Sequence, residues 1–452
     1  MALATTDPVR LPPEPRLPMV VQGIGFMAAK NVLLAAMGRR CGGAFTLNLP
    51  VLGQTVVISD PKLVKDLFGT STDVVERPTH FGKAFGPGSM FSLTGQELLA
   101  RRRLVVPAFH GSRVANYKQI VEDEVMREIA NWPEGREFET LDPMLRITLG
   151  AILRAVFGAE GSALDELRAL LPPAIALASW LYMMPEAVRR DLGPWSPGGR
   201  SMGHRRRFDA VVFSLIDRAR ADRRLDERTD VLSLLVQARY EDGEPIPDQH
   251  IADELLTLVA AGHETTATSL AWAVERLRRH PRLLARLTEE ADAGGSELRQ
   301  ATIWEVQRTR PVIDGTTRRT KTRIRLGEWV IPEDYTVFVS SRLAHASEDN
   351  FAAAASFNPD RFIGAKPPSA WMPFGGGVNR CIGAAFANME TDVALRTLLR
   401  ELRFEPTDAP DERSHWRGVA FAPGRGGRAV VYRRTPEPSS GAECDSMPGH
   451  AS

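Results

Sequence analysis

The chain has 452 residues, of which 43% are hydrophobic and 25% are charged, and this composition is typical of a globular protein with a large buried core. Its 57 basic and 56 acidic residues give a formal net charge of +1, which excludes a chain-wide basic field of the kind that binds nucleic acid. Three cysteines cannot form a disulfide framework or a four-cysteine metal site, so we expect any functional thiol to act alone in a reducing compartment.

The two ends of the chain predict segments outside the folded body. Residues 1–18 are rich in proline, which favours an extended arm, and residues 435–452 are rich in proline, serine and glycine, which predicts a disordered tail. We find no charged segment followed by an apolar one, the pattern of an export signal. The apolar stretch 17–37 is interrupted by Gln22 and Lys30 and predicts no transmembrane span, so we expect a cytoplasmic protein.

The segments between these ends predict one large domain, mainly α with a minor β region, over residues 19–434. Alternating β-branched residues around Gly53 predict a hairpin over residues 45–60, and helical patterns dominate from about residue 62 to 280. A β-rich stretch at residues 320–340 and a long helix at residues 382–400 follow. Loops are expected near residues 77–95, 185–203 and 241–247.

Residues 248–280 predict a single helix, because an aspartate can cap its start and a His–Pro step provides the next stop. At 1.5 Å per residue this helix is roughly 50 Å long, so we expect it to cross the whole body. Its apolar centre is interrupted by Gly262, Glu264 and Thr265. The glycine costs roughly 1 kcal/mol relative to alanine, and a buried glutamate costs more unless it is paired.

Two explanations of this polar centre are open. It is either a capped surface turn or a local widening of the helix beside a small ligand, in which case Glu264 and Thr265 can relay protons. A zinc helix is excluded, because Ala267 occupies the position where a second histidine is needed after His263.

Residues 371–383 carry the most informative local pattern. Three consecutive glycines let the backbone pass close to a flat or bulky partner, and Cys381 follows at the start of the helix expected from Ile382. Backbone N–H groups and the helix dipole favour a thiolate there, which suits ligation of a haem iron by one sulfur. An inert buried cysteine is the alternative. A dinucleotide-binding loop is excluded, because Arg380 stands where its last glycine belongs.

Five motifs follow one another along the chain: residues 95–109 with the run Arg101-Arg102-Arg103, residues 261–266, an E-x-x-R element at Glu305 and Arg308, residues 357–362, and residues 374–383. In content and order they resemble the cytochrome P450 family, and the resemblance covers about residues 11–433. It implies the cytochrome P450 fold, a single, mainly α prism with a minor β region. It also implies haem b (iron protoporphyrin IX) as the cofactor, held by one cysteinate.

The resemblance implies a role for each matched residue. Cys381 becomes the axial ligand of the iron, and Glu264 and Thr265 deliver protons during oxygen activation. The E-x-x-R pair and Arg361 form a structural charge cluster on the cysteine side. The other residues expected to contact the haem are Phe374, Gly375, Gly377, Gly383, Ala261, Arg102 and Arg318.

Two positions depart from the family pattern where haem propionates are commonly bound. Asn379 stands where a basic residue is usual, two positions before the cysteine, and Leu98 stands where an aromatic residue or histidine is usual. Arg102 and either Arg318 or Arg319 are then the expected propionate contacts. The arginine run has an alternative role, as a solvated face or a docking patch for an acidic redox partner.

The implied activity is O2-dependent monooxygenation of an apolar small molecule, with electrons from a separate ferredoxin and its NAD(P)H-dependent reductase. We expect substrate-facing walls at residues 80–91 and 170–194, although the apolar run 180–184 can equally be ordinary helix core. The rival functions are a haem-thiolate enzyme that uses peroxide or a pre-oxidised substrate, and a haem-binding protein without turnover. The intact Glu264–Thr265 pair favours the monooxygenase.

Overall fold

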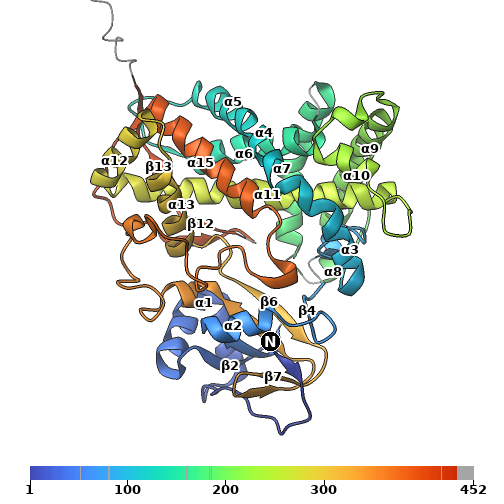
Figure 1. The fold of residues 1–452 in the computed structure, drawn as a ribbon, viewed down its shortest axis with the longest axis vertical. Helices are drawn as coiled ribbons and strands as arrows, with labels where there is room; N and C mark the ends of the chain where they lie inside the picture. The colour runs from blue at the N-terminus through green and yellow to red at the C-terminus, as the bar shows by residue number, and fades with distance from the viewer. Residues whose placement is uncertain are drawn as a thin grey trace, which may run out of the picture.

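The computed structural model describes residues 1–50, 52–79, 82–158, 161–182, 184, 186–418 and 420–434, and most of them are helical, as predicted (Figure 1). Short 3-10 turns, η1 to η5, lie at Gly82–Ala84, Val106–Phe109, Leu225–Glu227, Pro359–Phe362 and Gly377–Asn379. The α-helices are α1 Met19–Cys41, α2 Pro61–Phe68, α3 Gly95–Val105, α4 Ser112–Asn116, α5 Lys118–Ile129, α6 Leu141–Phe157, α7 Ser162–Tyr182, α8 Glu186–Arg189, α9 Pro197–Ala221, α10 Val231–Gln237, α11 Asp248–Arg278, α12 Pro281–Asp292, α13 Glu297–Thr309, α14 Ser341–His345 and α15 Ala384–Glu401.

The strands form a smaller part of the molecule: β2, β4, β6 and β7 lie in the lower part of Figure 1 together with α1 and α2, whereas β12 and β13 lie among the other helices. The largest sheet has the order β2-β3-β9-β6-β4, in which β3 and β9 are parallel, and the hairpin predicted at residues 45–60 is confirmed as β2 and β3. The strands are β1 Leu3–Ala4, β2 Ala44–Leu49, β3 Gly53–Ile58, β4 Val75–Glu76, β5 Phe138–Glu139, β6 Gly315–Thr320, β7 Ile324–Leu326, β8 Trp329–Ile331, β9 Thr336–Ser340, β10 Leu402–Phe404, β11 Ser414–Trp416, β12 Phe421–Pro423, β13 Arg428–Ala429 and β14 Val431–Arg433.

The long helix predicted over residues 248–280 is confirmed as α11, which runs through the helical part of the molecule (Figure 1). Every residue of α11 is described and α-helical, so neither the surface turn nor the widening expected at its polar centre is present. Instead α6 packs along it, and the Thr148 hydroxyl donates a 2.9 Å hydrogen bond to the carbonyl of His263. Asp248 does not cap the helix, because a proline takes the cap position and Asp248 forms an ion pair with Arg220 of α9.

The E-x-x-R element of α13 forms the buried charge cluster that the resemblance implies. Arg308 donates two 2.7 Å hydrogen bonds to the Glu305 carboxylate, and Nε of Arg361 lies 3.3 Å from the same carboxylate. Arg308 also donates to the carbonyl of His345, whose Nε2 accepts the N–H of Met372 at 3.0 Å. Burial lowers the pKa of His345 to about 3, so its ring is neutral and can accept that bond. The cluster thereby supports the start of the cysteine loop.

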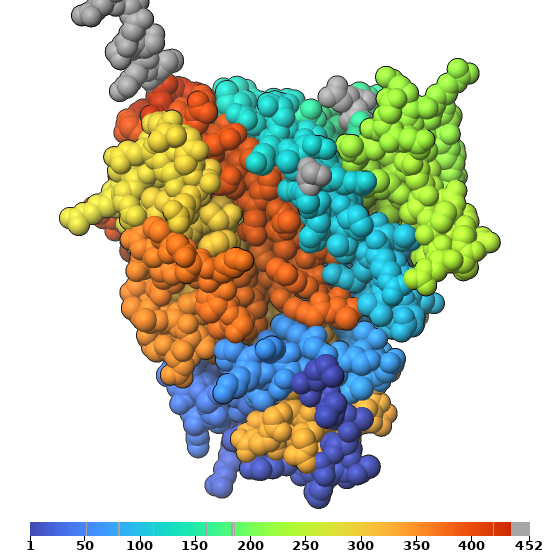
Figure 2. Space-filling model, viewed as in Figure 1, coloured from blue at the N-terminus to red at the C-terminus, as the bar shows by residue number. Residues whose placement is uncertain are grey.

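Three features differ from the predictions. The loop expected at residues 185–203 contains α8 and the first turns of α9, and the helix expected from Ile382 begins at Ala384. The arm at residues 1–18 is largely extended, but its β1 pairs with β7, which brings the blue N-terminal residues against the amber segment in Figure 2. The tail predicted at residues 435–452 lies outside the described residues.

Among the described residues, α1 is the one helix long and apolar enough to cross a membrane by length and composition. Its most apolar window has a mean hydropathy of 1.5, despite the interruptions at Gln22 and Lys30. The backbone of Ala29, with φ of −145° and ψ of 43°, interrupts this helix, so each of its two pieces is shorter than a bilayer is thick, and the absence of a transmembrane span stays a prediction. Only 17% of that window is buried, so most of the helix lies at the molecular surface.

Candidate active site

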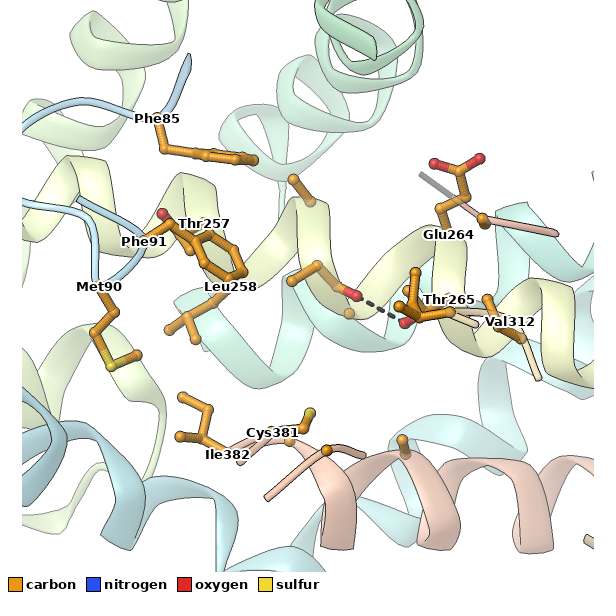
Figure 3. Close-up of a pocket in the computed structure, with 18 of the residues that line it drawn as sticks. Phe85, Met90, Phe91, Thr257, Leu258, Glu264, Thr265, Val312, Cys381 and Ile382 are labelled. Atoms are coloured by element: carbon orange, nitrogen blue, oxygen red, sulfur yellow. Dashed lines mark hydrogen bonds between the residues drawn. The ribbon is translucent and has the colours of Figure 1, made fainter. Parts of the chain in front are cut away.

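A cavity of about 630 Å³ lies between α11 and the loop that carries Cys381 (Figure 3). Cys381 borders it from one side and α11 crosses the other, with Thr265 on the border. Most of the lining side chains are apolar, among them Met90, Leu258 and Ile382. An enclosed apolar space with a few convergent polar groups is the usual form of a small-molecule site.

The loop before α15 is held in place by its own backbone. The N–H of Cys381 donates to the carbonyl of Phe374 at 3.0 Å, and the N–H of Gly375 donates to the carbonyl of Met372 at 3.1 Å. Gly375 and Gly377 have φ angles of +63° and +64°, which glycine adopts without strain. This turn places the thiol of Cys381 at the cavity, three residues before α15 begins.

Two of the three glycines make room for another residue of the protein itself, Phe68 at the end of α2. A Cβ on Gly376 would lie 2.1 Å from the Phe68 ring, and a Cβ on Gly377 would lie 2.1 Å from the Phe68 carbonyl oxygen. No described atom lies within 4 Å of the Cβ position of Gly375, which borders the cavity. The sequence predicts a close partner for this glycine run, and in the structure that partner is the end of α2. Of the three glycines, only Gly375 has free space where a Cβ would lie.

Cys381 is exposed to the cavity, but the protein packed around its thiol desolvates it and raises its pKa, while a hydrogen bond from the backbone of Gly383 and the charges of Arg102 and Arg380 lower that pKa. The sequence predicts a thiol whose ionisation is favoured by a helix start, but α15 begins at Ala384 and desolvation outweighs the backbone effect. A bound metal ion would reverse this balance, because a thiol that coordinates a metal is deprotonated.

Three arginines gather at one side of the cavity, and none of them forms an ion pair with a described carboxylate. Arg77 and Arg102 line the cavity, and Arg318 is buried behind the cysteine loop, where it donates to the carbonyl of Gly376 at 3.2 Å. Burial, together with repulsion from Arg102 and Arg77 respectively, lowers the pKa of Arg77 and of Arg318 to about 10. Arg318 is buried and Arg77 and Arg102 are partly buried, and such cations without an acidic partner fit an anionic ligand.

Arg318 and Arg319, which the sequence leaves as alternative propionate contacts, are neighbours on strand β6. Successive residues of a strand point to opposite faces, so Arg318 reaches the cysteine loop whereas Arg319 pairs with Asp334 at 3.0 Å. Arg77 is a residue that the sequence did not single out. It stands alone between Glu76 and a proline after β4, and no spacing pattern distinguishes it from a surface arginine.

Thr265 and Glu264 both border the cavity, but they point in different directions (Figure 3). The Thr265 hydroxyl donates to the carbonyl of Ala261 at 2.7 Å. The Glu264 carboxylate points away from Cys381, and its Oε1 lies 3.9 Å from Nε of Arg417. Burial raises the pKa of Glu264 and Arg417 lowers it. The described structure has no hydrogen bond between Glu264 and Thr265, so a relay through both needs a rotation of Glu264 or an intervening water.

The predicted substrate walls border the cavity in part. The first is represented by Ala84, Phe85, Met90 and Phe91, and the second by Leu170, Leu171, Ala174, Ile175, Ala178 and Ser179 of α7. In the run 180–184, Trp180 is 47% exposed and Leu181 is buried away from the cavity, while Met183 lies outside the described residues. The sequence analysis missed a further wall of the cavity, because the start of α9 was predicted as a loop. The residues of this wall are Ser201, His204, Arg205 and Phe208.

A family model for cytochrome P450 matches residues 11–427. The chain belongs to the cytochrome P450 family. Cytochrome P450 138 of Mycobacterium tuberculosis strain H37Rv is 51% identical over 429 residues, which cover 94% of this chain and 97% of that relative. Cytochrome P450 135B1 of the same strain is 35% identical over 447 residues, which cover 95% of this chain and 93% of that relative.

Solved cytochrome P450 structures share the fold. The retinoic acid-bound cyanobacterial CYP120A1 aligns with a TM-score of 0.81 over 95% of this chain and 100% of its own, at 20% identity. The haem domain of cytochrome P450DA aligns with a TM-score of 0.79 over 95% of this chain and 99% of its own, at 22% identity. The mainly α cytochrome P450 fold predicted from the sequence is confirmed.

Cytochrome P450 proteins are generally monooxygenases with a haem-thiolate cofactor, and the cavity fits that cofactor. The thiol reaches the cavity, and Arg77 and Arg102 offer positive charge there. Leu98 and Asn379 also border it, but Leu98 has no donor, and Oδ1 of Asn379 is buried without a partner. The cavity thus lacks the usual side chains at two positions where the family commonly binds haem propionates, and Arg77 supplies positive charge there instead.

The residues predicted to contact the haem divide into two groups. Gly377 and Arg318 do not line the cavity, because one packs on α2 and the other supports the loop from behind. The others all line it: Cys381, Phe374, Gly375, Gly383, Ala261 and Arg102. Glu264 and Thr265, predicted to be catalytic, line it as well.

Proposed function

We propose that the chain is a haem-thiolate monooxygenase that inserts one atom of O2 into an apolar small molecule. The observation that carries this proposal is the largely apolar cavity with the Cys381 thiol on one side and Thr265 of α11 at its border. Haem, when bound, supplies the iron at which O2 is activated. Cys381 would ligate that iron, with the remaining contacts from Phe374, Gly375, Gly383 and Ala261.

The arginines would hold and orient the cofactor. Arg77 and Arg102 have donors at the cavity wall for the two propionates, and their excess positive charge would be neutralised by those groups. Arg318 would act from behind, by fixing the carbonyl of Gly376 and hence the cysteine loop. This division supports a haem site despite Leu98 and Asn379.

Thr265 and Glu264 would manage protons. The Thr265 hydroxyl is held at the cavity border by the Ala261 carbonyl, so its oxygen can accept a hydrogen bond from a cavity water, and a rotation that releases Ala261 would let it donate its own proton. Glu264 lines the same cavity and is 16% exposed beside Arg417, so it would exchange protons with water and pass them toward Thr265. Its raised pKa keeps part of its population protonated closer to neutral pH than an ordinary glutamate.

The substrate would be an apolar molecule, because aromatic and aliphatic side chains dominate the walls. The CYP120A1 structure of the same fold binds retinoic acid, which is one example of such a ligand. We propose that electrons come from separate proteins, a ferredoxin and its NAD(P)H-dependent reductase. We place the enzyme in the cytoplasm, since its cysteine content suits a reducing compartment.

The first test is the absorbance spectrum of the reduced protein with carbon monoxide. A red-shifted Soret band that is lost in Cys381→Ala would support a haem-thiolate centre, and full activity of that variant would overturn the proposal. The second test is product formation from apolar compounds with ferredoxin, reductase and NAD(P)H. Product with peroxide alone would favour a peroxygenase, and a normal spectrum without any turnover would favour a haem-binding protein.

A further inference from the structure

The first half of α1, residues 19–28, turns its polar side chain toward the protein and its apolar side chains toward solvent. Gln22 is 1% exposed and accepts a 2.9 Å hydrogen bond from the backbone of β2. Val20, Ile24 and Met27 are 61%, 62% and 62% exposed, and their spacing of four and three residues places them on one helix face. This is the reverse of the pattern of a helix on a water-facing surface.

The helix is firmly attached along its inner side. Lys30 forms a 3.0 Å ion pair with Asp314 and lies 4.7 Å from the centre of the Phe338 ring, which borders the cavity. Leu34 and Met37 pack in a hydrophobic cluster with side chains of β2, β3 and β9. To cross a bilayer, α1 would have to break all these contacts. We therefore expect α1 to stay on the protein, where its exposed apolar face can lie along the surface of a membrane.

The charged residues of α1 and of the two positions that precede its N-cap proline are all basic. The acid-free segment 16–41 contains four charged side chains, Arg16, Lys30, Arg39 and Arg40. Arg16, Arg39 and Arg40 are exposed, and none of the three pairs with a described carboxylate. Lys30 is already paired with Asp314, so the free charges of this segment are Arg16 before the helix and Arg39 and Arg40 at its far end. An apolar helix face with exposed arginines at both ends and no acid within the helix matches the interface of a membrane with anionic headgroups.

We propose that the exposed face of α1, defined by Val20, Ile24 and Met27, docks the protein on the surface of an anionic lipid membrane. A protein partner fits the face less well, because the exposed side chains at its centre are aliphatic and offer no hydrogen-bonding group to fix an orientation. The same helix contacts Phe338 of the cavity wall, so docking would bring the active-site cavity close to apolar compounds dissolved in lipid. Docking itself does not depend on the proposed reaction.

The test is flotation of the haem-loaded protein with vesicles of equal parts phosphatidylglycerol and phosphatidylcholine, against vesicles of phosphatidylcholine alone. We expect the protein to bind the anionic vesicles, and we expect this binding to weaken as salt is added. Ile24→Glu and Met27→Glu should each weaken binding about tenfold, because each removes one apolar side chain that would be buried in the membrane. Met126→Glu makes the same change at a 43% exposed methionine of α5 and should bind as the parent does.

The substituted side chains are exposed, so the variants should keep the carbon monoxide spectrum and the melting temperature of the parent. Absence of vesicle binding, or binding that Ile24→Glu and Met27→Glu leave unchanged, would overturn the proposal. Sedimentation that shows a dimer lost in these two variants, with no vesicle binding, would assign the face to a second copy of the chain instead. Each of these readouts is independent of catalytic turnover.

Discussion

Nε of Arg417 lies 3.9 Å from Oε1 of Glu264, and this ion pair accompanies a carboxylate that points away from Cys381 (Figure 3). Arg417 follows β11, and the next residue, Gly418, packs on Ser179 of α7, where a Cβ would come within 3.2 Å of the serine side chain. The partner of Glu264 is thus connected to a wall of the cavity. We expect the position of α7 to influence how readily Glu264 is released.

Arg417→Gln should shift the pH dependence of product formation. Arg417 lowers the pKa of Glu264, whereas burial raises it, so removal of the positive charge leaves burial unopposed and moves this pKa upward. The limb of the pH–rate profile governed by Glu264 should therefore move to higher pH. Arg417→Lys keeps the charge and should keep the parent profile. A profile that is the same in all three proteins would show that Glu264 does not control the rate.

Thr265→Ala should uncouple electron flow from product formation. NAD(P)H is still consumed, but without the hydroxyl at the cavity border several-fold more of the electrons end as hydrogen peroxide. The measurement is the ratio of product to peroxide per NAD(P)H. Thr268→Val is the matched control, because Thr268 is fully buried on the same helix and does not line the cavity. Equal coupling in both variants would place the proton relay elsewhere.

Arg102→Ala should weaken haem retention, since it removes a charge-assisted hydrogen bond donor from the cavity wall. Loss of one such bond, worth about 1.5–3 kcal/mol, corresponds to haem loss at least about tenfold faster. Transfer of haem to an apo-globin acceptor measures this rate. Arg103→Ala is the neighbouring control, because Arg103 pairs with Glu241 at the surface and does not line the cavity. Equal rates for the two variants would contradict a propionate role for Arg102.

The sequence was sufficient for the features that depend on local pattern. The length of α11, the hairpin β2–β3 and the turn that presents Cys381 follow from periodicity, from the position of proline and from glycine placement, which act over a few residues. The buried contact of Glu305 with Arg361 came from the resemblance to a family, because no local pattern pairs residues so far apart.

The features that the sequence missed depend on tertiary neighbours. Arg77 becomes important only because folding buries it beside Arg102, and its motif is ordinary. The orientation of Glu264 depends on Arg417, a residue 153 positions away along the chain. The glycine-rich start of α9 was predicted as loop, although it is helical and packs closely: a Cβ on Gly198 would lie 2.1 Å from the carbonyl of Arg190.

Arg308→Ala should unfold or severely destabilise the protein, because Glu305 would be left as a buried charge without its main partner. Removal of one partner of such a pair costs about 3–5 kcal/mol. Urea unfolding of the haem-loaded protein measures the change. The control is Arg286→Ala, which breaks an ion pair with Asp360 that is about half exposed and is expected to contribute less than about 1 kcal/mol. Similar losses in both variants would refute the structural role of the cluster.

The last prediction concerns the substrate site, where the loop between η1 and α3 is fixed to α11 through α9. Arg205 of α9 donates to the carbonyl of Phe85 at 2.7 Å and forms an ion pair with Asp253 of α11. The Asp253 carboxylate is fully buried and also accepts the N–H of Gly88 at 2.8 Å. Phe85 borders the cavity, so this arrangement holds one of its walls in place.

Arg205→Gln should therefore loosen the wall and weaken the binding of cavity ligands by about tenfold, the effect of losing one charge-assisted hydrogen bond. The dissociation constant of an apolar azole, read from the shift of the Soret band, measures this before a substrate is known. Arg220→Gln is the matched control, because it breaks the other ion pair between α9 and α11, with Asp248, and contacts no residue of the loop. If both variants bind the azole as the parent does, the loop keeps its position without Arg205. If both weaken binding equally, the effect comes from the packing of α9 on α11 rather than from the loop.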